Sequence, residues 1–161
     1  MKFSEEKTLS ILVDWCNKGE RCRFDIERKL KRWGADPEFI AICTQRLSKG
    51  DLFNDSRFAS AYAHDKSSLQ RWGIQKIKMN LKARGIKEEY IQIAIEHIEP
   101  EVHNENLKEL ATRKWPSIKG KNDYERTVKL VQFLMRRGFP YDTIKKVLPQ
   151  KADWLDEINP L

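Results

Sequence analysis

Three glycines recur at an almost constant spacing in this 161-residue chain, and this repeat constrains the fold more than any other feature. Gly34 and Gly85 are 51 residues apart, and Gly85 and Gly138 are 53 residues apart. Apolar residues recur at fixed distances on both sides of each glycine. The matched sets are Ile26, Ile77 and Leu130; Leu30, Leu81 and Leu134; Ala35, Ile86 and Phe139; Ile40, Ile91 and Ile144; and Cys43, Ala94 and Val147. Each repeat therefore predicts a helix, a glycine turn and a second helix.

Helix boundaries can be predicted from residues with special backbone preferences. Asp36 before Pro37 is typical of an N-cap followed by a proline in the first turn. Each of the three glycines follows a basic or aromatic residue, as expected where a helix ends in the left-handed conformation. Further N-cap candidates are Ser4, Ser68, Asn104 and Asp123.

One more helical stretch precedes each helix pair, so we predict an all-α fold. The expected architecture is an elongated tandem array of three three-helix units, with about nine helices. The predicted units are residues 1–53, 54–101 and 102–161, and the last of them includes a C-terminal tail. A unit of this size is marginally stable alone, and stacking on a neighbour buries its remaining apolar faces. Chance similarity between helical hairpins is the simpler alternative, but five matched positions at three sites disfavour it.

The composition favours a protein that stays inside the cell. Apolar runs such as Ile11–Val13 are far shorter than the roughly 18 residues of a membrane-spanning helix. The first residues lack the apolar segment of a secretory signal. The chain has three cysteines, Cys16, Cys22 and Cys43, and no CxxC pair, which favours reduced thiols in the cytoplasm over disulfides or a zinc site.

No catalytic motif is recognisable, so we expect no catalytic residue, no metal and no cofactor. The histidines, His64, His97 and His103, belong to no HExxH pattern or Cys/His cluster. Any of the three cysteines could supply a thiol nucleophile, but no base is adjacent to them in sequence. Cys43 also occupies a repeat position with Ala94 and Val147, which favours a core role. Acids such as Glu105 and Glu109 are interpreted as a solvated run. An enzyme is not excluded, because active sites assemble across a fold.

A net charge of +7, from 31 basic and 24 acidic residues, favours an acidic partner. We predict that Arg71, Lys78 and Lys82 share one stripe beside the apolar face around Ile77. The full set of candidate contact residues is Arg71, Trp72, Lys76, Lys78, Lys82, Arg84, Lys129, Arg136 and Arg137.

Some of these residues have equivalent positions in the repeat, as Lys76 has with Lys129 and Arg84 with Arg137. Basic sites that repeat along a chain suit a repeating anionic partner. The alternative is a solvated face whose cations stabilise helix C-termini. Trp33, Trp115 and Trp154 are predicted to be packing residues, whereas Trp72 is either a packing residue or an exposed contact.

Three sequence segments, in this order and at this spacing, resemble the bacterial RecX family. The first is Asp55–Ala59 with Tyr62, which is similar to the family's D-x-x-F-A-x-x-Y pattern. The second runs from Arg71–Gly73 to Arg84–Ile86. The third is Phe133–Phe139, which is similar to the closing F-L-x-R-R-G-F pattern. The resemblance extends over nearly the whole chain.

The resemblance implies a non-enzymatic modulator, mainly an inhibitor, of the RecA recombinase. Such a protein binds in the groove of the RecA filament on single-stranded DNA and blocks ATP hydrolysis, strand exchange and co-protease activity. It would thereby regulate DNA repair, recombination and the SOS response. We expect a monomer that binds no membrane and that could also contact DNA directly.

Two other functions remain open at the level of the sequence. A stand-alone helical DNA-binding module would bind bare DNA tightly and in a salt-dependent manner without RecA. A scaffold for other acidic proteins would bind partners in nuclease-treated lysate, with no RecA among them.

Overall fold

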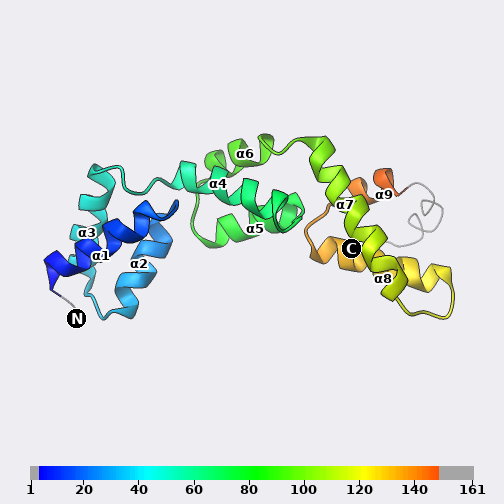
Figure 1. The fold of residues 1–161 in the computed structure, drawn as a ribbon, viewed down its shortest axis with the longest axis horizontal. Helices are drawn as coiled ribbons and strands as arrows, with labels where there is room; N and C mark the ends of the chain where they lie inside the picture. Colours follow the sequence, from blue (N-terminus) through cyan, green and yellow to red (C-terminus); the bar gives the residue numbers. More distant parts are fainter. Residues whose placement is uncertain (1–3, 149–161) are drawn as a thin grey trace. The chain divides into compact units, whose positions relative to one another are not determined.

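The computed structural model describes residues 4–148 and confirms the predicted all-α fold (Figure 1). Nine α-helices and one 3₁₀ turn make up this part of the chain, which contains no strand. The elements are α1 (Glu5–Asn17), α2 (Arg23–Arg32), α3 (Pro37–Lys49), α4 (Asp55–Ser68), α5 (Ile74–Ala83), α6 (Glu88–Glu96), α7 (Pro100–Lys114), η1 (Trp115–Ser117), α8 (Asp123–Arg136) and α9 (Tyr141–Val147). Their number and order along residues 4–148 are consistent with three consecutive three-helix repeats.

The three repeated glycines end α2, α5 and α8 in the predicted conformation. Their φ angles are +77° at Gly34, +67° at Gly85 and +98° at Gly138. In each turn the amide after the glycine donates to the carbonyl of the leucine four residues before the glycine, over 3.1, 3.2 and 3.1 Å. This hydrogen bond satisfies a carbonyl that the helix end would otherwise leave without a donor.

The matched apolar positions of the repeat supply the interior. Leu30, Leu81 and Leu134 are buried, and so are the isoleucines six residues after each glycine. The repeat is therefore a repeat of core positions, because the same places on successive helices bury the same kind of side chain.

Some of the predicted helix starts are wrong. The side chains of Ser4 and Asp36 cap α1 and α3 as predicted, by accepting from the amides of Lys7 and Phe39. However, Asn122 rather than Asp123 caps α8. Asn104 lies inside α7, because Pro100 already starts that helix. Ser68 is the last residue of α4 rather than a cap.

Contacts divide the chain into two compact units that cut across the middle three helices. Unit 1 contains the chain up to Ala61 together with Leu81–Ala94. Part of its core lies between α1, α2 and α3, and Trp33 packs against it as predicted. These core residues are Leu12, Cys16, Ile26, Leu30, Ile40, Cys43, Leu47 and Phe53. Cys43 thus has the core position that the repeat predicts.

Unit 2 contains Tyr62–Asn80 together with the chain from Ile95 onward. Its core joins α7, α8 and α9, which lie together in Figure 1. Trp115 packs against this core as predicted. These core residues are Leu107, Ala111, Ile118, Leu130, Val131, Leu134, Phe139, Ile144 and Leu148. Trp154, for which a packing role is predicted, lies outside the described residues. The predicted repeat boundaries at residues 53 and 101 stay a prediction.

Candidate functional site

A cluster of three cations and two aromatic rings forms the strongest candidate site, and it lies within unit 2. We call it the Trp72 cluster. Lys76 Nζ lies 4.1 Å from the centroid of the Trp72 ring, and Lys66 Nζ lies 4.8 Å from the same centroid. Tyr62 meets Trp72 edge to face, with ring centroids 6.4 Å apart. The members of the Trp72 cluster are Tyr62, Lys66, Trp72, Lys76 and Arg137.

Two neighbouring cations disfavour the charge of Lys76. Burial, together with the positive charges of Arg137 and Lys66, lowers the pKa of Lys76. Within residues 4–148, no carboxylate forms an ion pair with any of these three cations. The aromatic faces offset part of this repulsion through cation–π contacts. An anionic ligand would offset more of it, so the cluster is suited to an acidic partner.

A close approach of two glycines holds the cluster together. The Gly73 amide donates to the Arg137 carbonyl over 2.8 Å, and the Gln75 amide donates to the Gly138 carbonyl over 2.9 Å. A Cβ atom on Gly73 would overlap the Gly138 carbonyl group. The link between α4 and α5, which carries Trp72, is thereby fixed to the turn after α8, which carries Arg137. The Arg137 guanidinium donates back to the Gln70 carbonyl over 2.6 Å.

Polar side chains of α7 contact the same link. His103 Nε2 accepts from the Ile74 amide over 3.3 Å, and the His103 ring lies 4.9 Å from the Phe139 ring. Burial lowers the pKa of His103, so this ring is neutral at neutral pH and can accept the hydrogen bond. Asn106 Nδ2 donates to the Ser67 carbonyl over 3.0 Å. The Trp72 cluster therefore rests on a polar network inside unit 2.

The predicted stripe of Arg71, Lys78 and Lys82 is wrong in one member. Arg71 precedes α5 and has a φ of +52°, so it does not lie on that helix. Its guanidinium binds both carboxylate oxygens of Glu109, over 2.7 and 3.2 Å. Such a bidentate pair is among the stronger surface contacts. The guanidinium of Arg71 is thus held by an ion pair with Glu109 of α7. Glu109 therefore has a structural partner and is not simply a solvated acid as predicted.

The remaining candidates have different surroundings. Lys82 and Arg84 belong to unit 1, where Lys82 pairs with Glu88 at 3.3 Å and Arg84 Nε lies 3.9 Å from an Asp25 carboxylate oxygen. Lys78 is half-buried on α5, and Arg136 is exposed on α8. Lys129 pairs with a glutamate one turn earlier in α8. Of the nine candidates, only Trp72, Lys76 and Arg137 come together in the Trp72 cluster.

Sequence reasoning missed Tyr62 and Lys66. Lys66 stands four residues after Tyr62, and Lys66 Nζ lies 5.3 Å from its ring centroid, which is a pairing typical of helices. That spacing could have marked the pair. Nothing local places the two beside Trp72, because the contact depends on how the chain turns between α4 and α5.

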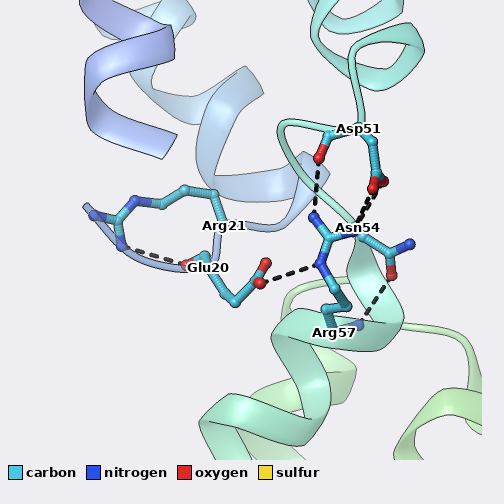
Figure 2. A network of polar contacts seen from close by, with 5 residues as sticks. All are labelled: Glu20, Arg21, Asp51, Asn54 and Arg57. Atoms are coloured by element: carbon cyan, nitrogen blue, oxygen red, sulfur yellow. Dashed lines mark hydrogen bonds and ion pairs between the residues drawn. The ribbon is translucent and has the colours of Figure 1, made fainter. Parts of the chain in front are cut away.

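A second polar network fastens unit 1 near the start of α4 (Figure 2). Arg57 Nη1 binds the Asp51 carboxylate at 2.8 and 2.9 Å, and Arg57 Nε binds Glu20 at 3.1 Å. These hydrogen bonds raise the pKa of Arg57. Arg57 thus ties the loop between α1 and α2 to the loop between α3 and α4 through partly exposed ion pairs.

The residues considered for catalysis have ordinary surroundings. Burial raises the pKa values of the thiols of Cys16 and Cys43, and raises that of Cys22 to about 12. All three are therefore protonated at neutral pH. His97 is exposed as predicted. Within residues 4–148, no group of three metal-binding side chains is placed to hold an ion, and no helix is long and apolar enough to cross a bilayer.

Comparison with known proteins assigns these helices to a family. The model of the RecX third three-helix domain matches residues 101–148, and that of the second matches residues 54–95. The two matches together cover more than half of the chain. The chain belongs to the RecX family. RecX proteins are named as regulatory proteins, so the chain is a member of a family of regulators.

Several RecX proteins match over most of this chain. Regulatory protein RecX of Limosilactobacillus reuteri (strain DSM 20016) is 29% identical over 150 residues, which are 91% of this chain and 57% of the relative. The chain thus spans little more than half of that relative. Regulatory protein RecX of Prosthecochloris aestuarii (strain DSM 271 / SK 413) is 27% identical over 144 residues, which are 89% of this chain and 93% of the relative.

The fold agrees with solved RecX structures. A crystal structure of a regulatory protein RecX matches with a TM-score of 0.81 and 26% identity, covering 90% of this chain and 73% of the other. The tandem array of three-helix units that the glycine repeat predicts is therefore the architecture of the RecX family.

Proposed function

We propose that this chain is a non-enzymatic modulator of the RecA recombinase that binds the RecA filament on single-stranded DNA. Binding would lower ATP hydrolysis, strand exchange and co-protease activity. The Trp72 cluster is the main observation on this chain that supports the proposal, because it combines closely spaced cations with aromatic rings. Membership in the RecX family supplies the identity of the partner.

The charge of the Trp72 cluster supports an acidic target. Lys66 and Arg137 both disfavour the charge of Lys76, and an anion that approaches Lys76 would offset this effect. A filament of RecA on DNA presents phosphate groups as well as protein carboxylates. Binding to such a surface would release counterions and weaken as salt rises.

The proposed inhibition is mechanical. Hydrolysis in the filament needs movement between neighbouring RecA subunits. A bound chain that touches more than one subunit would resist this movement and would also occupy the groove that a second DNA strand enters. The described residues that would make the contact are the Trp72 cluster, followed by the exposed or half-buried Lys78, Lys82 and Arg136.

The test is a titration of this chain into RecA assembled on single-stranded DNA, with ATP turnover as the signal. We expect turnover to fall with increasing chain concentration, and we expect weak binding to the same DNA without RecA. Unchanged turnover at saturating chain would overturn the proposal. Tight, salt-dependent binding to bare DNA with unchanged turnover would instead support a stand-alone DNA-binding module.

A further inference from the structure

A basic groove lies between η1 and one face of α8, inside unit 2. Its volume is about 420 Å³. The residues that α8 contributes are spaced by three, four and seven positions, so they share one face of the helix. The lining residues are Lys114, Ser117, Ile118, Lys119, Lys129, Gln132, Phe133 and Arg136.

The charge of the groove is one-sided. Four of its lining residues are cations, and among the described residues no carboxylate lines it. Glu125 lies beside it and pairs with Lys129 at 3.2 Å. Lys114 Nζ lies over the Phe133 ring, 5.0 Å from its centroid. Lys119 and Arg136 are exposed and form no ion pair with another residue of the described segment 4–148, so both can reach a ligand.

The wall opposite α8 is already held in place. Arg126 donates through Nε to the Ile118 carbonyl and through Nη2 to the Trp115 carbonyl, both over 3.0 Å. Its guanidinium carbon also lies over the Trp115 ring, 3.9 Å from the centroid, in a cation–π contact. Lys129 Nζ donates to the Lys119 carbonyl over 2.7 Å. The segment from η1 to Lys119 is therefore fixed by α8 before any ligand binds, which lowers the cost of binding.

We propose that this groove is a binding site for phosphate groups. Lysine and arginine are the side chains that proteins use for phosphate, and the exposed Gln132 offers a further hydrogen-bond donor. Two sources carry this chemistry: the phosphodiester backbone of a single nucleic-acid strand, and a small free polyphosphate. The proposal concerns the chain alone and does not depend on RecA, so its failure leaves the proposed function standing.

The experiment uses the full chain with two probes, inorganic tripolyphosphate and oligothymidylates of about 6 and about 30 nucleotides. Calorimetry measures the affinity for tripolyphosphate, and fluorescence anisotropy measures the affinity for each oligothymidylate. The test variant is Lys119→Glu with Arg136→Glu. The matched control is Lys108→Glu with Arg32→Glu, which reverses the same residue types at exposed positions outside the groove. Circular dichroism melting establishes that both variants fold.

We expect the groove variant to bind at least about tenfold more weakly than the control. The slope of log affinity against log salt should also become shallower, by about one for each phosphate group that the variant no longer binds. Stoichiometric binding of tripolyphosphate that displaces the oligonucleotide supports a free polyphosphate as the source. Binding of the long strand alone supports a nucleic-acid backbone. The proposal would be overturned if neither tripolyphosphate nor the oligonucleotides bind the chain. It would also be overturned if the control variant loses as much affinity as the groove variant.

Discussion

The glycine turns after α5 and after α8 have the same local structure but different surroundings. Both glycines have a positive φ, and both turns contain the same hydrogen bond back to a leucine carbonyl. A Cβ atom on Gly85 would meet no atom within 4 Å. A Cβ atom on Gly138 would lie 2.6 Å from the Lys76 amide nitrogen and 2.7 Å from the Gly73 carbonyl oxygen. One glycine is required by the turn alone, and the other by the turn and by packing.

This difference shows how one repeated motif acquires a second role. In unit 2, the space at Gly138 lets the link between α4 and α5 approach the backbone, and that approach aligns Trp72, Lys76 and Arg137. In unit 1, the Gly85 turn carries no such contact, and partly exposed ion pairs around Arg57 fasten the unit instead. Backbone contacts withstand salt, whereas exposed ion pairs are screened by it.

The largest effect is expected for Gly138→Ala. The left-handed conformation costs a non-glycine residue about 1–2 kcal/mol. The overlap with Lys76 and Gly73 adds an overpacking cost of about 1–3 kcal/mol. We therefore expect the free energy of unfolding, measured by urea denaturation, to fall by about 2–5 kcal/mol. A decrease near 1 kcal/mol would show that the two glycine backbones do not pack as described.

Gly85→Ala is the matched comparison and should cost about 1–2 kcal/mol, because only the backbone conformation is strained. The same urea titration measures it. If Gly85→Ala proves as harmful as Gly138→Ala, the turn alone explains both effects, and the comparison between the two regions fails.

A smaller effect is expected from the protonation of His103, whose buried ring accepts the Ile74 amide. Burial lowers its folded-state pKa, so below the ordinary histidine pKa of about 6.5 the unfolded chain binds a proton that the folded chain does not. Stability is therefore complete above about pH 6.5 and falls as the pH drops, by at most about 1.4 kcal/mol per pH unit.

The measurement is the urea midpoint between about pH 7 and about pH 5. His103→Gln keeps a hydrogen-bond acceptor without the titration, so its stability should fall less over this range than that of the parent. The control is His97→Gln, at an exposed position, which should follow the parent. Identical pH profiles for both variants would remove His103 from the network.

The sequence predicts those features of this chain that depend on neighbouring residues. The glycine turns, the buried leucines and the caps at Ser4 and Asp36 follow from local backbone preferences and from the helical period. The RecX motifs lie on the same elements, so the family could also be recognised.

The Trp72 cluster could be predicted only in part, because it joins residues from α4, the following link, α5 and the end of α8. Two residues at equivalent repeat positions do not necessarily have the same neighbours. Lys76 and Lys129 share a repeat position, yet Lys76 meets an aromatic ring and Lys129 meets Glu125. The helical position predicted for Arg71 is wrong because α5 begins three residues later, and its partner Glu109 is 38 residues away.

The most direct test of the proposed function compares two charge-reversed variants in the RecA ATPase titration. Lys66→Glu with Lys76→Glu reverses two cations of the Trp72 cluster, and Lys18→Glu with Lys108→Glu reverses two exposed lysines outside it. We expect the cluster variant to need at least about tenfold more protein for half-maximal inhibition, while the control stays within about twofold of the parent. Equal potency of the two variants, with both of them folded, would contradict the assignment of the Trp72 cluster as the contact surface.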